Sequence, residues 1–343
     1  MSNMPLRIVL AGCGGMSGAW LDAVKTRLDV EVVGLVDIVE EAASKRANDY
    51  ALVDAVIGTD LVTVLGQTTP DIVFNCTIPE AHYAITMTAL KHGCHVLSEK
   101  PLASSIAQAR EMIDAAQQAG KLFAVIQNRR YDANIRRLRS LLASQELGPI
   151  TTVNCDFYIG AHFGGFRDHM PHVLLLDMAI HTFDAARLLT GADPVAVYCK
   201  EWNPVGSWYD RDASAIAVFE MTNGIVYTYR GSWCANGLAT TWESDWRIVA
   251  QNGSVKWDGT DNFQAQAVAE TGGFISTYRD VTLPALQPQD AIGGHAGLIH
   301  DFIECVSTGR QPETSASDNS KSLAMVFAAI ESAETGQRVA VQW

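Results

Sequence analysis

The sequence lacks an excess of basic residues. Its 343 residues contain 25 Lys and Arg against 38 Asp and Glu, which gives a formal net charge of −13 at pH 7. A protein that binds nucleic acid needs clustered Lys and Arg to displace counterions from the phosphates. The composition therefore argues against nucleic acid, and equally against an anionic membrane surface, as a partner.

Long apolar runs and paired cysteines are also missing. No stretch approaches the ~18 apolar residues of a membrane-spanning helix. The box Leu10–Cys13 resembles a lipoprotein cleavage site, but the apolar run before it is interrupted by Arg7 and is shorter than the about 7–15 residues of a signal peptide. The seven cysteines form no C-x-x-C pair and are too sparse for a disulfide scaffold. We therefore expect a cytoplasmic protein.

The first part of the chain alternates short apolar segments with helical patterns. Such alternation is typical of βαβ units, whose parallel strands are apolar throughout because helices cover both faces of the sheet. The expected strands are Leu6–Ala11, Val30–Val36, Asp71–Cys76, His95–Leu97 and Leu122–Ile126. The pattern predicts an N-terminal doubly wound (Rossmann) domain over residues 1–126.

From Pro149 onward the pattern changes to Thr, Val, Tyr and Trp with period-two alternation, which predicts antiparallel strands. The expected helices of this part are His172–Leu189, Gly297–Thr308 and Asp318–Thr335. The fold class is therefore α/β with a second α+β domain, residues 127–343, that carries a large, mainly antiparallel open sheet. We expect the last helix to pack back toward the first domain.

A glycine-rich turn follows the first strand directly. A dinucleotide turn needs one glycine for the tight bend and a second where backbone approaches the pyrophosphate, which then lies at a helix N-terminus. Gly12 and Gly14 fill these places, whereas Ser17 stands where a third glycine is usual. The candidate cofactor-binding residues of the turn are Gly12, Cys13, Gly14, Gly15 and Met16.

Asp37 ends the second strand, about 20 residues after the turn, where a carboxylate can bind the adenosine ribose hydroxyls. The same carboxylate repels the 2′-phosphate of NADP, and no Arg follows it directly. The sequence therefore predicts NAD as the cofactor. The alternative is an ordinary strand-to-helix turn, with Asp37 as a helix cap and no nucleotide.

Two stretches, Asn75–His82 and His95–Leu102, resemble the Gfo/Idh/MocA family of oxidoreductases, which includes glucose-fructose oxidoreductase and inositol dehydrogenase. The Glu99-Lys100-Pro101 sequence is the most recognisable mark. Asp177–His181 resembles the family's second motif, Asp-x-x-x-His. The resemblance extends through Gln127–Arg130 to the closing helix and strand, and so covers nearly the whole chain.

The resemblance implies an NAD-dependent oxidoreductase that acts on a secondary alcohol of a sugar, sugar derivative or cyclitol. It also implies a cis Lys100–Pro101 bond and a homodimer or homotetramer formed through the open face of the C-terminal sheet. Further cofactor contacts are implied for Thr77, Pro79, His82, Glu99 and Lys100. Substrate contacts are implied for Asn128, Arg129 and Tyr158.

Lys100, Asp177 and His181 are the candidate catalytic residues, and we expect all three to contact the substrate. Lys100 follows a strand at the edge where open α/β sheets bind ligands. Asp177 and His181 lie four apart in an expected helix and would share one face. His181 is the expected base, Asp177 orients it, and the Lys100 ammonium stabilises charge on the reacting oxygen. The alternative is a surface lysine, a helix N-terminal acid and a structural histidine.

The segment Gly160–His169 is a glycine-rich loop before this helix. His162 and Arg167 are its candidate substrate ligands, and a plain solvated connector is the equal alternative. The pair His169 and His172 has no cysteine or carboxylate cluster at zinc spacing, so no metal is expected. Most tryptophans between 202 and 257 are expected in the core or an interface, with Trp208 and Trp233 as exceptions that could stack on sugar rings.

Two other functions stay open. In the first, the same hydride step oxidises a glycoside transiently, so that the aglycone is eliminated and NAD is regenerated. In the second, the chain is a non-catalytic NAD-binding sensor. Accumulation of NADH with free sugars separates the dehydrogenase from the first, and absence of any turnover despite NAD binding would favour the second.

Overall fold

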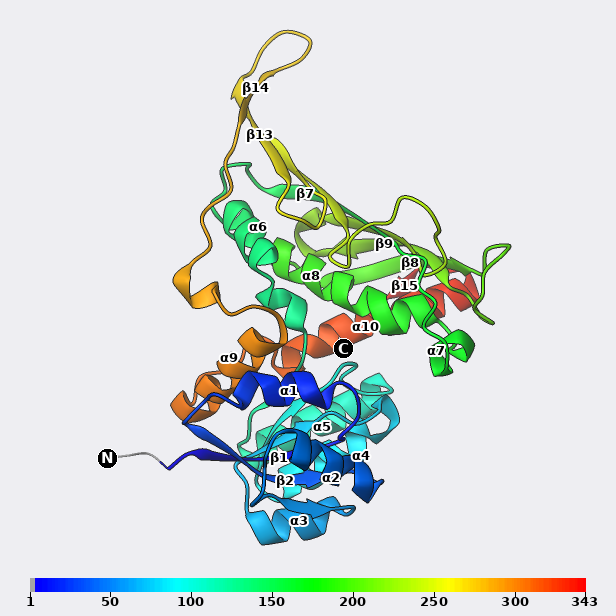
Figure 1. Ribbon diagram of the computed structural model, residues 1–343. Coiled ribbons are helices and arrows are strands. Elements are labelled where there is room, and N and C mark those ends of the chain that lie inside the picture. Colours follow the sequence, from blue (N-terminus) through cyan, green and yellow to red (C-terminus); the bar gives the residue numbers. More distant parts are fainter. Residues whose placement is uncertain (1–3) are drawn as a thin grey trace. The chain divides into compact units, whose positions relative to one another are not determined.

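Two separate sheets organise the chain in the computed structural model, which describes residues 4–343 (Figure 1). Unit 1 runs to Tyr131 and also takes in Ile292–Leu323, whereas unit 2 consists of Asp132–Ala291 and Ala324–Trp343. The expected single boundary after residue 126 therefore differs from the structure, because a segment from far along the chain completes unit 1. The second boundary falls within one long helix, α10 (Ala316–Thr335).

Unit 1 contains a parallel sheet with strand order β3-β2-β1-β4-β5-β6. The order reverses between β1 and β4, which is the position where open α/β sheets bind ligands at the carboxyl ends of their strands. The strands are β1 (Leu6–Ala11), β2 (Val30–Val36), β3 (Val56–Gly58), β4 (Ile72–Asn75), β5 (His95–Ser98) and β6 (Phe123–Val125). Five match the expected segments. The edge strand β3 has only three residues and was not expected.

Helices connect these strands, and some of them begin with a side-chain cap. They are α1 (Ser17–Val24), α2 (Glu40–Asp49), α3 (Leu61–Thr68), α4 (Pro79–Lys91) and α5 (Ile106–Ala119). At α5 the Ser105 hydroxyl accepts the N–H of Gln108 at 3.2 Å and caps the helix. At α4 the cap position is Ile78, because the hydroxyl of Thr77 donates to Asn75 instead, at 2.6 Å.

The returning segment Ile292–Leu323 is part of the unit 1 core. Its helix α9 (Gly294–Thr308) begins before the expected Gly297 and packs against α1. Phe302 and Ile303 of α9 are fully buried in the same cluster as Trp20 of α1. Beyond α9, the N–H of Val125 in β6 donates to the carbonyl of Thr314 at 3.1 Å. The segment thus adds both apolar contacts and a backbone bond.

Unit 2 contains a nine-stranded sheet with order β14-β13-β12-β11-β7-β10-β9-β8-β15. All pairings are antiparallel except β7 with β10, so the sheet is mixed and mainly antiparallel, as expected. The strands are β7 (Ile150–Tyr158), β8 (Pro194–Trp202), β9 (Ser214–Met221), β10 (Val226–Ser232), β11 (Asp245–Ala250), β12 (Gly253–Trp257), β13 (Phe263–Glu270), β14 (Thr277–Asp280) and β15 (Val339–Ala340).

Helices cover only one face of this sheet. The unit carries α6 (Ala133–Ala143), the short α7 (Phe166–His169) and α8 (Ile180–Thr190). Phe183 of α8 packs edge-on against Phe219, Tyr227 and Tyr229, whose rings point from β9 and β10 toward the helix. The alternate residues of these strands form the uncovered face, which we call the open face.

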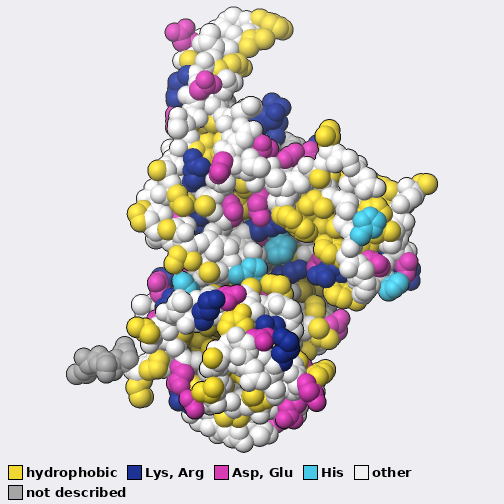
Figure 2. Space-filling model, viewed as in Figure 1, with side chains coloured by type: hydrophobic (Ala, Val, Ile, Leu, Met, Phe, Trp, Pro, Cys, Tyr) yellow, Lys and Arg dark blue, Asp and Glu magenta, His cyan; other side chains and the backbone are white. Residues whose placement is uncertain are grey.

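The β13–β14 hairpin projects beyond the rest of unit 2 (Figure 1). Hydrophobic side chains gather at its tip (Figure 2), where Phe274 and Ile275 are exposed. None of the helices formed by residues 4–343 has the length and apolar character needed to cross a membrane.

The expected helix His172–Leu189 begins irregularly. Residues Leu174–Ala179 form a π-helical segment, and α8 continues from Ile180. Before it, His172 has a left-handed φ of +52°. Its Nδ1 lies 2.6 Å from Oε2 of the buried Glu201, and its Nε2 lies 3.5 Å from Glu334. The hydrogen bond to Glu201 is the main cause that raises the pKa of His172, while burial raises the pKa of Glu201.

This pair makes the stability of unit 2 depend on pH. Both pKa values are raised in the folded state, so folding takes up protons and stability falls as pH rises. We expect wild type to exceed His172→Gln in melting temperature most clearly below pH 6.5, the ordinary His value, and the difference to shrink as pH rises through the raised pKa. Thermal melts between pH 5.5 and about 8.5 check this. A difference that stays constant over the range would contradict it.

Candidate active site

The glycine turn lies at the end of β1 with a geometry that only glycine tolerates. Gly12 has a φ of +90°, and a Cβ there would lie 2.6 Å from the carbonyl atoms of Cys76. Nothing lies within 4 Å of the Cβ positions of Gly14 and Gly15. The turn therefore packs tightly against β4 on one side and leaves the backbone at Gly14 and Gly15 open to a ligand.

Ser17 explains the departure from the usual third glycine. Its buried hydroxyl donates to the carbonyl of Gly14 at 2.6 Å and closes the turn. From α2, Arg46 donates to the same carbonyl at 2.9 Å, and the Tyr50 hydroxyl donates to the carbonyl of Gly18 at 2.9 Å. The sequence patterns did not reveal this clamp, because nothing in the spacing of Arg46 and Tyr50 points to the turn.

Asp37 is bonded to the turn that it serves. Its Oδ2 accepts the N–H of Cys13 at 2.8 Å, and its Oδ1 accepts the N–H of Val39 at 2.9 Å. Burial, followed by the Asp37 charge, raises the pKa of the Cys13 thiol to about 12, which keeps it protonated. Met16 caps α1 without a side-chain bond, and the first turn of α1 holds no acidic residue. The amide groups of this helix end therefore suit a pyrophosphate, and the residues present fit NAD.

We predict that Gly12→Ala disrupts both folding and cofactor binding. The left-handed φ alone costs about 1–3 kcal/mol for a residue with a side chain, and the new Cβ would collide with Cys76. Thermal melts and NADH fluorescence titration should show a lower melting temperature and at least about tenfold weaker binding. Gly66→Ala on α3 is the matched control, because nothing lies within 4 Å of its Cβ position. Wild-type melting and affinity in Gly12→Ala would refute the prediction.

The ends of β4 and β5 are held together by a buried histidine. Nδ1 of His82 lies 2.8 Å from the carbonyl oxygen of Pro101, and Nε2 lies 3.1 Å from that of Thr77. The His82 side chain is completely buried, and burial is the main cause that lowers its pKa. A side chain without exposed surface cannot touch a bound dinucleotide. The direct contact predicted for His82 is therefore wrong, and its role is to support the loops of Thr77 and of Pro101, with Pro79 starting α4 beside them.

Lys100 lies two residues after the end of β5, and the Lys100–Pro101 peptide is cis, as the resemblance implied. The preceding Glu99 is buried. Its Oε1 accepts the indole N–H of Trp20 at 3.0 Å, and its Oε2 accepts the backbone N–H of Lys100 at 3.2 Å. Nε2 of His295, in the first turn of α9, lies 4.0 Å from Oε1 of Glu99. Sequence reasoning missed both Trp20 and His295, since neither belongs to a motif.

Two candidate substrate residues lie in a short 3-10 helix, Asn128–Tyr131, after β6. Asn128 is half-buried and Arg129 is buried. The neighbouring Arg130 anchors this turn, because it donates to the carbonyl of Glu313 at 3.1 Å and to the Asp318 carboxylate at 2.6 Å. Both partners belong to the returning segment of unit 1.

In unit 2, Asp177 lies within the π-helical segment and His181 lies in the first turn of α8. The expectation that they share one face assumed regular α-helix spacing, whereas the segment around Asp177 is π-helical, so the shared face stays a prediction. Asp177 accepts the Nε–H of Arg167 at 2.9 Å and the Nη2–H at 3.4 Å. The structure thus joins two predicted site residues, Arg167 and Asp177, by an ion pair that the sequence patterns did not reveal.

The loop before α7 is anchored by aromatic contacts. The carbonyl of Ala161 accepts the Trp208 indole N–H at 2.8 Å and the Tyr209 hydroxyl at 2.7 Å. The exposed His162 ring stacks on Trp208 at 3.7 Å between centroids. The guanidinium of Arg167 lies 5.0 Å from the ring centroid of Phe163. The loop is therefore ordered by these contacts, and its role as a substrate surface stays a prediction.

Of two aromatic residues singled out in unit 2, Trp233 needs correction and Tyr158 stays untested. Strand alternation places Tyr158 on the open face with Asp156 and Arg230, whereas α8 covers the opposite face. Burial raises the pKa of Tyr158, and its contact with the substrate stays a prediction. Trp233 is 1% exposed and packs edge-on against Phe157 at 4.9 Å, so it belongs to the core and cannot stack on a sugar.

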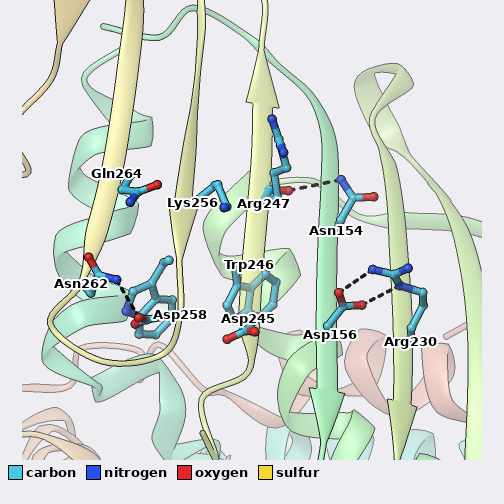
Figure 3. Close-up of a pocket in the computed structure, with 11 residues that line it drawn as sticks. Asn154, Asp156, Arg230, Asp245, Trp246, Arg247, Lys256, Asp258, Asn262 and Gln264 are labelled. Carbon is cyan, nitrogen blue, oxygen red and sulfur yellow. Dashed lines mark hydrogen bonds and ion pairs between the residues drawn. The ribbon is translucent and has the colours of Figure 1, made fainter. Parts of the chain in front are cut away.

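The open face also carries a pocket of about 390 Å³ (Figure 3). Arg230 there donates to both oxygens of Asp156, and the amide of Asn154 donates to the carbonyl of Arg247 at 3.4 Å. Trp246 and Trp257 contribute to its lining. None of the predicted catalytic residues is among the residues that line this pocket.

His169 and His172, the pair considered as metal ligands, each pair with a different carboxylate. His169 lies 2.5 Å from Asp210, and this hydrogen bond is the main cause that raises the pKa of His169. His172 is paired with Glu201, as described above. Within residues 4–343, no group of three or more His, Cys, Asp or Glu side chains has an arrangement that could hold a metal ion.

Comparison with known families decides the class of protein. Residues 6–127 match the model of an oxidoreductase family with an NAD-binding Rossmann fold, Gfo/Idh/MocA, and residues 135–256 match the C-terminal domain of the same family. The chain belongs to the Gfo/Idh/MocA family. It is accordingly an NAD-dependent oxidoreductase, and the predicted family, fold and cofactor are confirmed.

Several relatives of this family are similar to the chain. D-glucoside 3-dehydrogenase of Escherichia coli K12 is 32% identical over 56% of each protein. The 1,5-anhydro-D-fructose reductase of Ensifer adhaerens is 25% identical over 97% of this chain and 98% of the relative. Among solved structures, an oxidoreductase from Agrobacterium radiobacter in complex with NAD+, L-tartaric acid and magnesium superposes with a TM-score of 0.84 at 20% identity, covering 98% of this chain and 99% of that one.

Proposed function

We propose that this NAD-dependent oxidoreductase transfers a hydride between a secondary alcohol of a sugar, sugar derivative or cyclitol and the nicotinamide. The observation that carries the proposal is Lys100, which follows β5 at the ligand-binding edge of the parallel sheet and is tied to the buried Glu99 through its backbone. The relatives that act on glucosides and anhydrofructose support the same substrate class.

The chemistry assigns one role to each candidate residue. Bound NAD would supply the nicotinamide ring that accepts the hydride. His181 takes the proton of the substrate hydroxyl, and the Lys100 ammonium donates a hydrogen bond to the same oxygen as negative charge develops there. Asp177 supports His181 from within the π-helical segment, and its bonds to Arg167 fix the orientation of its carboxylate.

The loop before α7 provides the substrate surface of unit 2 in this proposal. His162 on its Trp208 support offers a flat ring and polar nitrogens, and Arg167 offers N–H donors beside aromatic rings. Flat rings stack on sugars while donors bind hydroxyl groups. From unit 1, Asn128 and Arg129 keep their predicted role as substrate ligands.

A spectrophotometric screen tests the function directly. Formation of NADH from polyols, aldoses and alkyl glycosides identifies a net dehydrogenase. Cleavage of a glycoside without net NADH would replace it by redox-assisted elimination. Binding of NADH without turnover of any compound would leave only the sensor, and the proposal would then be abandoned.

We predict that Lys100→Ala and His181→Ala each lower kcat by about 100-fold to 10,000-fold, the usual range for a proton-transfer or charge-stabilising group. Steady-state kinetics on the substrate found by the screen measure this. Lys91→Ala and His92→Ala, at the exposed end of α4, are matched controls. Wild-type kcat in either active-site variant would remove that residue from the mechanism.

We further propose that the enzyme is a homodimer or homotetramer formed through the open face of the unit 2 sheet. Large apolar residues at alternate positions of β8, β9 and β10 are about two-fifths exposed or more, among them Tyr198, Ile216 and Val218. A second copy of the same face would bury them. The free cysteines fit the reducing cytoplasm, where we propose that the enzyme works.

We predict that Ile216→Asp together with Val218→Asp shifts the enzyme toward the monomer, because two charges would then be buried in the interface. Size-exclusion chromatography with light scattering measures the mass. Leu28→Asp, at a residue of unit 1 that is 97% exposed, is the control and should leave the mass unchanged. An unchanged oligomer in the double variant would exclude this face.

A further inference from the structure

Glu99 is the most enclosed acidic side chain beside the candidate catalytic lysine. Its side chain is 11% exposed, so it offers little surface to a bound dinucleotide. Both carboxylate oxygens already have protein partners, the indole of Trp20 and the backbone N–H of Lys100. The family resemblance implied that Glu99 contacts the cofactor. A carboxylate with both oxygens already bonded is better suited to holding its neighbours.

The two bonds fix Lys100 through its main chain. Trp20 is fully buried, and its ring packs against Phe74 of β4 with centroids 5.0 Å apart. The indole therefore provides a rigid donor from α1, and Glu99 transmits that rigidity to the backbone N–H of Lys100. A carboxylate bonded on both oxygens has few other orientations available.

His295 approaches the same carboxylate from α9. Two glycines at the start of this helix leave no room for a side chain: a Cβ on Gly293 would lie 2.9 Å from the Tyr131 carbonyl oxygen, and one on Gly297 would lie 2.1 Å from that of Ile292. His295 is thus the polar side chain that this tight turn presents to Glu99. The long return of the chain to unit 1 brings it there.

The charges of this cluster act on one another. Burial is the main cause that lowers the pKa of His295, the Lys100 ammonium lowers it further, and the Glu99 carboxylate raises it. Glu99 and Lys100 are the charged groups that influence His295, and its own helix adds none. The titration of His295 therefore reports on the charges of Glu99 and Lys100.

We propose that Glu99 is the positioning residue for Lys100, and that Trp20 from α1 and His295 from α9 hold Glu99 in that role. The inference rests on the proposed function, because it assumes that Lys100 acts on the substrate. It assigns a purpose to the segment Ile292–Leu323: this segment completes the support behind the catalytic lysine, in addition to the core.

The first test needs no turnover. Histidine Cε1–H resonances are followed by NMR against pH, and the His295 signal is identified by its loss in His295→Gln. We expect Glu99→Gln to lower the pKa of His295 further, because a carboxylate that raises it is removed. We expect Lys100→Met to raise it, because a nearby cation is removed.

The second test separates positioning from stability. His295→Gln and Trp20→Phe should lower kcat about tenfold while changing KM for NAD by less than about threefold, since a displaced Lys100 weakens the transition state more than cofactor binding. His300→Gln is the matched control. Nε2 of His300 lies on the same helix, 2.7 Å from the carbonyl oxygen of Ala23, away from Glu99. It should lower the melting temperature without changing kcat.

The outcomes keep the two proposals apart. If Glu99→Gln and Lys100→Met leave the titration of His295 unchanged, or if His295→Gln behaves like His300→Gln, the positioning role is overturned while the proposed function stands. If Lys100→Ala keeps wild-type turnover, the proposed function fails whatever the NMR titration shows. Coupled titration together with the kcat loss supports the positioning role.

Discussion

The close approach of Gly12 to the backbone at Cys76 is the constraint on which the cofactor half of the enzyme depends. The approach lies between β1 and β4, where the strand order of the sheet reverses. Because no side chain intervenes, the chain can leave β1 directly beside the end of β4 and start α1 over the sheet edge. The bond from Cys13 to Asp37 then brings the end of β2 to the same turn. The absence of a side chain at Gly12 thus allows the ends of β1, β2 and β4 to meet at one turn.

The sequence predicted this half well because its signals are local. Buried parallel strands are short apolar runs, and the turn, Asp37 and Lys100 each come within two residues of a strand end, so their order along the chain already places them at one edge of the sheet. The strand β3 was missed because it has only three residues and none of them is buried. The contact assigned to His82 was wrong because burial cannot be read from a motif position.

The substrate half was less accessible to prediction. A π-helical segment differs from an α-helix only in hydrogen-bond spacing, which leaves no mark on composition, so the sequence did not reveal the irregular backbone around Asp177. Successive side chains of a strand point to opposite faces, so the face on which Tyr158 lies depends on the register of β7, in which it is the last residue. Arg167 with Asp177, Arg46 with the glycine turn and His295 with Glu99 are contacts between elements, and a single sequence contains no information on which distant residues meet.

The division of unit 1 between two distant parts of the chain has a consequence for biosynthesis. The ribosome releases the strands of the parallel sheet first, but the apolar surface of α1 around Trp20 stays uncovered until Phe302 and Ile303 have emerged. The part of the chain that is translated first therefore waits for the segment Ile292–Leu323 to complete its core, and Asp132–Ala291 of unit 2 is synthesised in between. Such long-range closure slows folding and makes a nascent chain dependent on protection of that surface during synthesis.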